Sequence, residues 1–153
     1  MELKFKPIIR TLIAYYGILQ SLHLLVLLRA GVILFLQTRF PFPILPPPGG
    51  WEGQTIPFMI GLGTTDLAGI LLGQFFAYRA LITGTFYRRL GVISLTIFIT
   101  GAIVFAFGTL PSGAWIAHPI AYGSMAFLFA PTVILYVWLL RSNISRKPTQ
   151  KLT

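Results

Sequence analysis

Four long apolar blocks dominate this sequence and limit what it can fold into. A membrane-crossing helix needs roughly 20 predominantly apolar residues, and every block is long enough. The blocks end at charged residues or at stretches rich in Pro and Gly, and they cover residues 11–36, 56–78, 90–110 and 119–140. Because they are continuously apolar rather than alternating, they predict helices and not barrel strands. The expected fold is an all-α integral membrane protein, a single domain over residues 1–153 with four transmembrane helices in an antiparallel bundle.

The charged residues predict how this bundle is oriented. Twelve Lys and Arg stand against three Asp and Glu, which gives a formal net charge of +9. Cations concentrate on the cytoplasmic side of membrane proteins. Ten of the twelve fall on one side of the expected bundle: Lys4, Lys6, Arg10, Arg79, Arg88, Arg89, Arg141, Arg146, Lys147 and Lys151. The charge therefore indicates a cell-membrane protein with cytoplasmic termini, a basic tail over residues 141–153 and no nucleic-acid partner.

The loop over residues 37–55 differs from the other connections. Five of the eight residues from Pro41 to Pro48 are Pro, a composition that favours polyproline II and forbids a helix. We expect an outer strap on the bundle, with a docking surface for an outer partner as the alternative.

Asp66 is the acidic residue inside the four blocks. Ionisable side chains at that depth are costly and are functional candidates by default. Helical geometry places Asp66 on one face with Gly69, Gly73 and Ala77, a small-residue series that allows a second helix to approach closely. Asp66 is therefore predicted to face a helix. Arg29 lies at a similar depth and is the natural candidate for an ion pair with Asp66, but its angular position on the first block, nearly opposite Gln20, is less favourable, and snorkelling toward the headgroup region is the alternative.

The two histidines, His23 and His118, raise the question of haem. His23 lies near the middle of the first block, one turn after Gln20, whereas His118 stands at the start of the fourth. Two axial haem ligands must lie at the same level, so haem is a minor alternative. A hydrogen-bonded interior His is the preferred interpretation of His23.

A second group of candidates is predicted at the outer ends of the helices. Trp51 and Trp115 are typical interfacial anchors, and His118 before Pro119 fits a helix start. Glu52 together with His118 has the residue types for acid–base chemistry, which would make this outer mouth a second candidate site.

The chain contains no Cys, which excludes thiolate metal sites, disulfides and Cys nucleophiles. It also carries no phosphate-binding loop, dinucleotide fingerprint, zinc-protease or Ser-hydrolase motif. We therefore predict no metal, no catalytic residues and no cofactor, with haem and quinone as minor alternatives.

The second block carries Asp66-Leu-Ala-Gly69 and is followed by a basic turn at Arg88-Arg89. This combination resembles the DoxX-type family of small four-helix membrane proteins. The resemblance covers the second and third blocks, while the long first block and the Pro-rich loop depart from it. It implies a subunit role in membrane redox or quinone-linked complexes.

Three functions are compatible with these observations. The leading hypothesis is a non-catalytic accessory or scaffold subunit, or a homo-oligomer, that packs helices against other membrane subunits or against itself. The second is transport of a small solute or protons by Asp66 with Arg29 or His23. The third is a membrane enzyme or quinone-binding protein with an outer-face site. A cavity that reaches Asp66 would favour transport or catalysis, and a sealed Asp66 paired with Arg29 would favour a structural role.

Overall fold

The computed structural model describes residues 7–37, 45–51 and 55–142, and in this part the chain forms helices and no strands. Helices α3 and α5 are joined by two short elements, η1 (Leu110–Ser112) and α4 (Ala114–Ala117). The described part contains four helices long and apolar enough to cross a membrane: α1 (Pro7–Gln37), α2 (Thr55–Leu81), α3 (Arg88–Thr109) and α5 (Pro119–Arg141). This confirms the predicted all-helical fold with four membrane-length helices.

The ends of these helices follow from local chemistry. Pro7 and Pro119 occupy first turns, where the missing N–H is no loss. Between α3 and α5, Gly113 adopts a φ of 79°, a left-handed conformation that glycine reaches without a Cβ penalty. The chain therefore turns tightly after η1 and forms α4 between the third and fourth apolar blocks.

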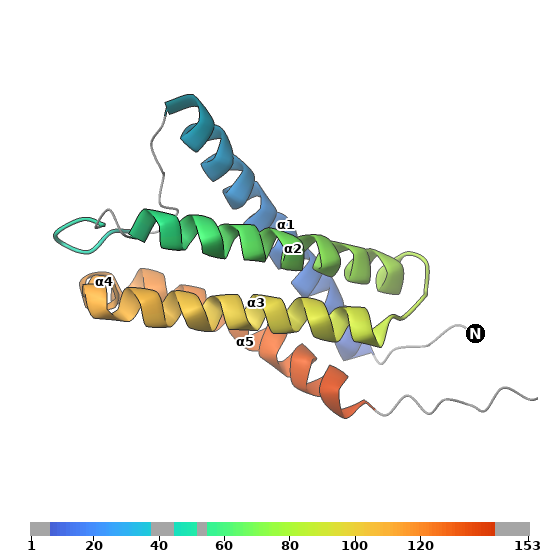
Figure 1. The fold of residues 1–153 in the computed structure, drawn as a ribbon. Helices are drawn as coiled ribbons and strands as arrows, with labels where there is room; N and C mark the ends of the chain where they lie inside the picture. Colours follow the sequence, from blue (N-terminus) through green and yellow to red (C-terminus); the bar gives the residue numbers. More distant parts are fainter. Residues whose placement is uncertain (1–6, 38–44, 52–54, 143–153) are drawn as a thin grey trace, which may run out of the picture.

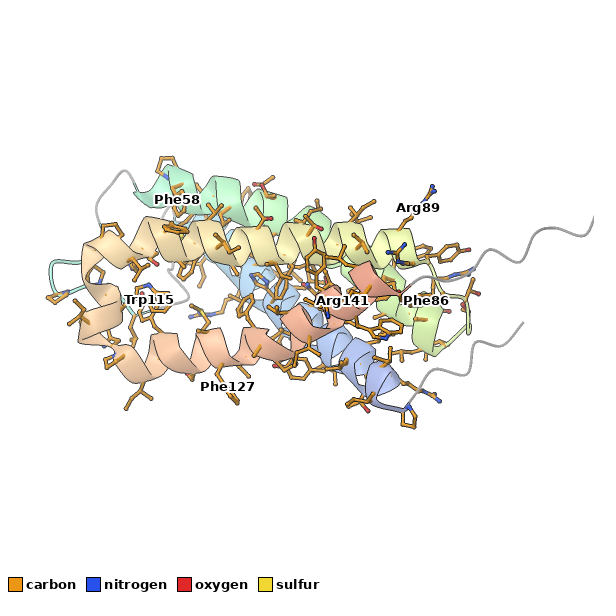
Figure 2. The ribbon with its side chains drawn as sticks, turned by 90° about the horizontal axis from the view of Figure 1, so that it is seen from below. Phe58, Phe86, Arg89, Trp115, Phe127 and Arg141 are labelled. Carbon is orange, nitrogen blue, oxygen red and sulfur yellow. The ribbon has the colours of Figure 1, made fainter. Side chains whose placement is uncertain are left out.

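The outer surface of the helices is apolar. Large side chains that a soluble protein would bury are mostly exposed, among them Phe35, Phe107, Ile116, Ile120 and Phe127. Figure 2 shows Phe127 pointing away from the neighbouring helices. Such a surface is stable in lipid and not in water, because only lipid can solvate it without ordering water around apolar groups.

The long helices do not pack equally along their lengths. Figure 1 shows α2 and α3 running side by side, while α1 and α5 cross them obliquely and the second half of α1 extends away. Contacts between helices are most extensive for α2 with α3 and for α1 with α2. We call the end with the start of α1 and the α2–α3 turn the basic end, and the end with α4 the loop end. Figure 2 places Arg89 toward the former and Trp115 toward the latter.

The basic end holds the hydrophobic core. Its fully buried side chains come from all four long helices, and they include Ile13, Phe76, Leu95, Leu135 and Leu139. A hydrogen bond between helices supports this packing: Arg88 Nε donates to the Leu139 carbonyl at 2.6 Å. Farther along, the Tyr15 hydroxyl donates to the Leu128 carbonyl at 2.7 Å and joins α1 to α5.

Candidate functional site

A cavity of about 540 Å³ occupies the loop-end half of the four helices, which is within the range of small-molecule sites. Of the described residues that line it, His23 of α1 and Asp66 of α2 are the two ionisable ones. The remaining lining is predominantly apolar, with Met59, Leu62, Phe98, Phe105, Trp115, Met125 and Phe129 among the larger side chains. The cavity is therefore an apolar chamber with one polar spot.

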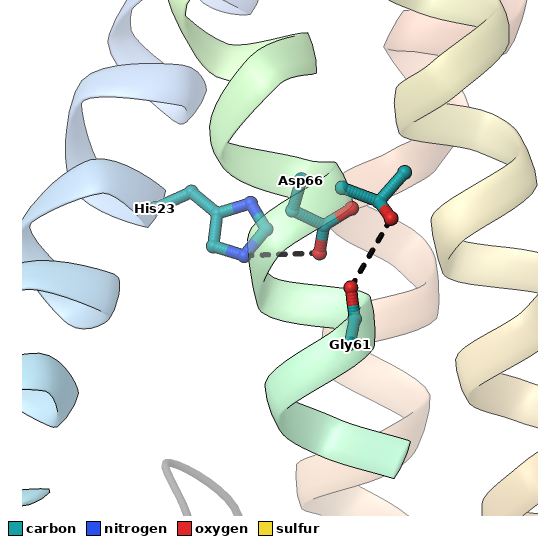
Figure 3. A network of polar contacts seen from close by, with 4 residues as sticks. His23, Gly61 and Asp66 are labelled. Carbon is teal, nitrogen blue, oxygen red and sulfur yellow. Dashed lines mark hydrogen bonds and ion pairs between the residues drawn. The ribbon is translucent and has the colours of Figure 1, made fainter. Parts of the chain in front are cut away.

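The polar spot consists of His23 and Asp66, whose side chains point toward one another (Figure 3). His23 Nε2 lies 3.7 Å from Asp66 Oδ2. This separation is within ion-pair range but too long for a well-formed hydrogen bond, so each group keeps hydrogen-bonding capacity. Their side chains are 28% and 12% exposed, and both line the cavity. A molecule in the cavity can therefore meet a carboxylate acceptor and an imidazole in one place.

Gly101 on α3 makes room for the Asp66 carboxylate. A Cβ at position 101 would overlap Asp66 Oδ1, so a larger residue there would displace the carboxylate or push α3 away. Helical periodicity places Gly101 on one stripe of α3 together with Ser94 and Phe98. The same stripe contributes to the site, because Phe98 and Gly101 both line the cavity.

Aromatic rings close the cavity toward the basic end. Phe98 stacks on Phe129 with ring centroids 4.8 Å apart and an interplanar angle of 14°. The Phe98 ring also contacts the His23 imidazole in an edge-type arrangement, with 6.1 Å between the two ring centroids. These three side chains form what we call the cavity floor, and they hold the imidazole against a rigid aromatic surface.

A buried polar group lies below the cavity floor. The Tyr16 and Ser94 hydroxyls are 2.5 Å apart and share a hydrogen bond, and Ser94 Oγ donates to the Gly69 carbonyl at 2.9 Å. Gly73 leaves space for them, since a Cβ there would lie 2.8 Å from both hydroxyl oxygens. The group also contains Gln20, which is fully buried.

Arg29 does not join Asp66 in the structure. Its side chain is exposed, and among the described residues the ion pair of Asp66 is with His23. The reason is rotational: His23 is on the face of α1 that meets α2, whereas Arg29 lies away from that face. Similar depth allows an ion pair of Arg29 with Asp66, but the exposed side chain agrees with the snorkelling alternative.

The small-residue series of α2 faces the neighbouring helices. A Cβ at Gly69 would lie 2.7 Å from Ile97 Cγ2, and one at Gly17 would lie 3.1 Å from Ala77 Cβ. With Gly73 below Tyr16 and Ser94, this face of α2 is occupied inside the chain. Its small residues therefore serve contacts with α1 and α3.

Three of the predicted outer-mouth residues, Trp51, Trp115 and His118, lie in the described part of the chain. His118 Nε2 lies 3.0 Å from the Pro46 carbonyl oxygen, and Trp115 Nε1 donates to Thr109 Oγ1 at 2.9 Å. Trp115 also lines the cavity, at its loop end. Trp51 is half-buried, whereas Glu52 lies outside the described residues. His23 lines the cavity from α1, whereas His118 stands just before α5 and contacts the Pro46 carbonyl, so the two histidines have different neighbours.

Residues 45–51 lie over the start of α5. The Tyr122 hydroxyl donates to the Leu45 carbonyl at 2.9 Å, next to the His118 contact with Pro46. The described part of the predicted strap is therefore fixed to the loop end, and the rest of that loop lies outside the described residues. Over the described ranges, no three His, Cys, Asp or Glu side chains gather as a metal site would require.

Comparison with known proteins adds no relative: no family model, curated protein or solved structure matches this chain. The DoxX-type resemblance remains an expectation from the sequence. A function has to be argued from the cavity and the residues around it.

Proposed function

We propose that this protein binds a lipophilic small molecule with a hydrogen-bonding head group inside the membrane, between its helices. The observation that carries the proposal is the apolar cavity of about 540 Å³ that ends at His23 and Asp66. Buried ionisable side chains within a membrane are costly and face cavities or partners. His23 and Asp66 face each other across 3.7 Å, and both also line the cavity.

The walls of the cavity favour an apolar body for the ligand. Several lining residues are also exposed on the outer surface of the helices, namely Val26, Ile103 and Val133. Because these helices cross the membrane, that exposure is to acyl chains rather than to water. A lipophilic molecule can therefore pass between lipid and cavity without entering water.

The polar spot and the cavity floor together favour a head group with oxygen. Asp66 can accept a hydrogen bond from a hydroxyl, and the His23 imidazole can donate to a carbonyl or accept from a hydroxyl, depending on its tautomer. The aromatic rings of Phe98 and Phe129 offer a flat surface for a planar ring. Phenols and quinones combine these features with an apolar tail.

Two of the other functions receive less support from the geometry. Transport through the molecule needs a path to the basic end, and there the helices close on the core around Ile13, Phe76 and Leu95. An outer-face enzyme needs convergent groups, and His118 is engaged by the Pro46 carbonyl. Binding needs only the cavity and its polar spot.

Titration with a short-tailed 1,4-benzoquinone in detergent tests the proposal, with tryptophan fluorescence as the signal because Trp115 lines the cavity. We expect saturable quenching in the wild-type chain. Asp66→Asn should weaken the affinity for the corresponding 1,4-dihydroxybenzene, measured by competition with the quinone, about 10-fold or more, since a hydrogen bond from a hydroxyl to a charged carboxylate contributes roughly 1.5–3 kcal/mol. Thr65→Val is the matched control, because the Thr65 hydroxyl donates to the Gly61 carbonyl of its own helix. Quenching that does not saturate, or dihydroxybenzene binding that Asp66→Asn leaves unchanged, would contradict the proposal.

An accessory-subunit or homo-oligomeric role is the second candidate, and it is supported by a different surface. A second hollow of about 530 Å³ lies between α2 and α3, on a face that includes Gly61, Thr65 and Thr100. A Cβ at Gly61 would meet no atom within 4 Å, so another helix could approach there. Native mass spectrometry of the same preparation reports bound partners, and a chain that appears only as an unpartnered monomer would argue against this role.

We also infer that the protein resides in a cell membrane with its termini on the cytoplasmic side. Five of the six arginines in the described part support this inference, because they belong to helix ends at the basic end: Arg10, Arg79, Arg88, Arg89 and Arg141. Concentration of cations on one side is the general signature of the cytoplasmic face.

A further inference from the structure

Arg79, in the last turn of α2, is a half-buried cation whose hydrogen-bonding capacity is only partly used. Its Nη2 donates to the Tyr87 hydroxyl at 3.2 Å, while its buried Nε has no hydrogen-bond partner among the described residues. A guanidinium carries five N–H donors in a fixed planar arrangement. A cation near a helix C-terminus is favourable for the helix dipole, which accounts for the position of Arg79 but not for its unused donors.

The Arg79 guanidinium is held in place by two aromatic rings and by the α2–α3 turn. Its Cζ lies 5.4 Å from the centroid of the Tyr87 ring and 6.0 Å from that of Phe75, both within cation–π range. The Arg79 carbonyl accepts from the Thr83 hydroxyl at 2.8 Å and from the Thr85 N–H at 2.9 Å. A guanidinium that is already positioned loses less freedom when it binds an anion.

The described part of the chain supplies no carboxylate to Arg79. Within residues 7–37, 45–51 and 55–142, Asp66 is the one acidic residue, and its ion pair is with His23. Four more arginines belong to helix ends at the basic end: Arg10, Arg88, Arg89 and Arg141. This end of the molecule therefore attracts anions from its surroundings.

An apolar strip lies beside the guanidinium on the outer surface of α2. Phe75 and Leu71 stand one and two turns before Arg79, so the three side chains occupy neighbouring positions along one face of the helix. Phe75 is 53% exposed and Leu71 is 56% exposed. In a membrane this strip contacts acyl chains rather than water. A molecule that binds here meets donors at its head and apolar surface along its tail.

We propose that Arg79 and Tyr87 bind the phosphate of an anionic phospholipid at the basic end. The Arg79 Nη groups donate to the phosphate oxygens, and the Tyr87 hydroxyl, which accepts from Arg79, donates its own proton to the same phosphate. One acyl chain lies along Phe75 and Leu71. The cytoplasmic leaflet is the one that carries anionic lipids. Neither Arg79 nor Tyr87 lines the cavity, so this site is independent of the ligand proposed there.

Two other arginines of the basic end show what distinguishes Arg79. Arg88 donates to the carbonyls of Leu139 at 2.6 Å and of Leu140 at 2.8 Å, so its guanidinium joins α3 to α5. Arg89 is exposed at the start of α3. Arg89→Gln therefore removes the same charge from the same end and leaves the contact between Arg79 and Tyr87 in place, which makes it the matched control.

Native mass spectrometry of the full chain in a neutral detergent tests the proposal by measuring lipid affinities. The probes are a phosphatidylglycerol and a phosphatidylcholine with identical acyl chains, and the salt is about 0.2 M, where charges that are exposed and distant are screened. We expect the wild-type chain to prefer phosphatidylglycerol. Arg79→Gln should weaken that binding about 10-fold or more, as the loss of a charge-assisted hydrogen bond predicts. Arg89→Gln should weaken it less than about 2-fold.

Three results would overturn the site. The first is equal affinity of the wild-type chain for the two lipids, and the second is an equal loss for Arg79→Gln and Arg89→Gln, which would indicate diffuse attraction between the basic end and anionic lipid. The third is displacement of phosphatidylglycerol by millimolar inorganic phosphate, which would make free phosphate the ligand.

Arg79→Lys is the second variant should Arg79→Gln not fold. It keeps the charge but loses the planar set of donors, so its affinity for phosphatidylglycerol should fall, and an affinity equal to that of the wild-type chain would also overturn the site. Quenching by the benzoquinone should be the same in all these variants, because the cavity is unaffected.

Discussion

The basic end and the loop end of this protein are built from the same helices but are filled differently. At the basic end, side chains of all four long helices interlock, and Ile13, Phe76 and Leu95 have no exposed surface. At the loop end, residues of the same helices surround a cavity of about 540 Å³. The second half of α1 extends away from α2 and α3 there, as Figure 1 shows.

The difference between the ends shows how a small membrane protein can combine stability with a binding site. Association of helices in lipid depends on close van der Waals packing, because lipid tails are as apolar as the side chains. The basic end supplies that packing, with Gly91 leaving room for the Phe76 ring. The helices pack less closely at the loop end, which leaves a cavity that a lipophilic molecule can fill.

The largest expected effect is a loss of packing at the basic end. Phe76 is fully buried and its ring centroid lies 5.8 Å from that of Phe86. Phe76→Ala should lower the free energy of unfolding by about 3–5 kcal/mol, as buried Phe truncations do. Thermal unfolding in detergent measures this loss, and Phe105→Ala is the control.

Phe105 lines the cavity and is only half-buried. Its ring already lacks neighbours on the cavity side, so truncation removes fewer contacts. Equal losses for the two variants would show that the ends do not differ in packing, and the comparison between them would be wrong.

An intermediate effect is expected when side-chain volume is added rather than removed. Ala77 is buried against Gly17, so Ala77→Leu should overpack the helices and destabilise by roughly 1–3 kcal/mol. Ala126 lines the cavity, so Ala126→Leu should fill empty space at little or no cost to the melting temperature. The same variant should weaken benzoquinone binding, because it occupies part of the cavity.

These two alanines give opposite signatures. Ala77→Leu is expected to lower the stability of the chain, whereas Ala126→Leu is expected to lower its affinity for the benzoquinone. If Ala126→Leu destabilised the chain as much as Ala77→Leu, the loop end would be as tightly packed as the basic end, and a cavity for a ligand would have no basis.

The sequence predicts the helices far better than it predicts the site. Helix bounds follow from the length and continuity of apolar residues, and from Pro7 and Pro119 in first turns. Asp66 could be selected because it is charged within an apolar block. Its partner could not, since a choice between His23 and Arg29 depends on how α1 rotates against α2, which neither depth nor composition determines.

The cavity itself could not be predicted from the sequence. Phe98 and Gly101 belong to a stripe that periodicity assigns to packing, and the structure shows that such a stripe can pack at one point and line a space at another. The deciding factor is the angle at which α1 and α5 cross α2 and α3. That angle depends on the sum of many contacts, each contributing only about 0.1–0.2 kcal/mol.

The smallest expected effect concerns the tie between α1 and α5. The Tyr15 hydroxyl donates to the Leu128 carbonyl across a sequence separation of 113 residues. Tyr15→Phe should destabilise the chain by only about 0.6 kcal/mol, the average for hydrogen bonds between membrane helices. Tyr78→Phe is the control, because Tyr78 is exposed.

The same hydrogen bond also affects the cavity floor. Because α5 contributes Phe129 to the floor, the bond from Tyr15 fixes the floor relative to His23. If that inference holds, Tyr15→Phe should weaken benzoquinone binding more than its small effect on melting suggests, whereas an unchanged affinity would mean that the stack of Phe98 on Phe129 positions the floor without it.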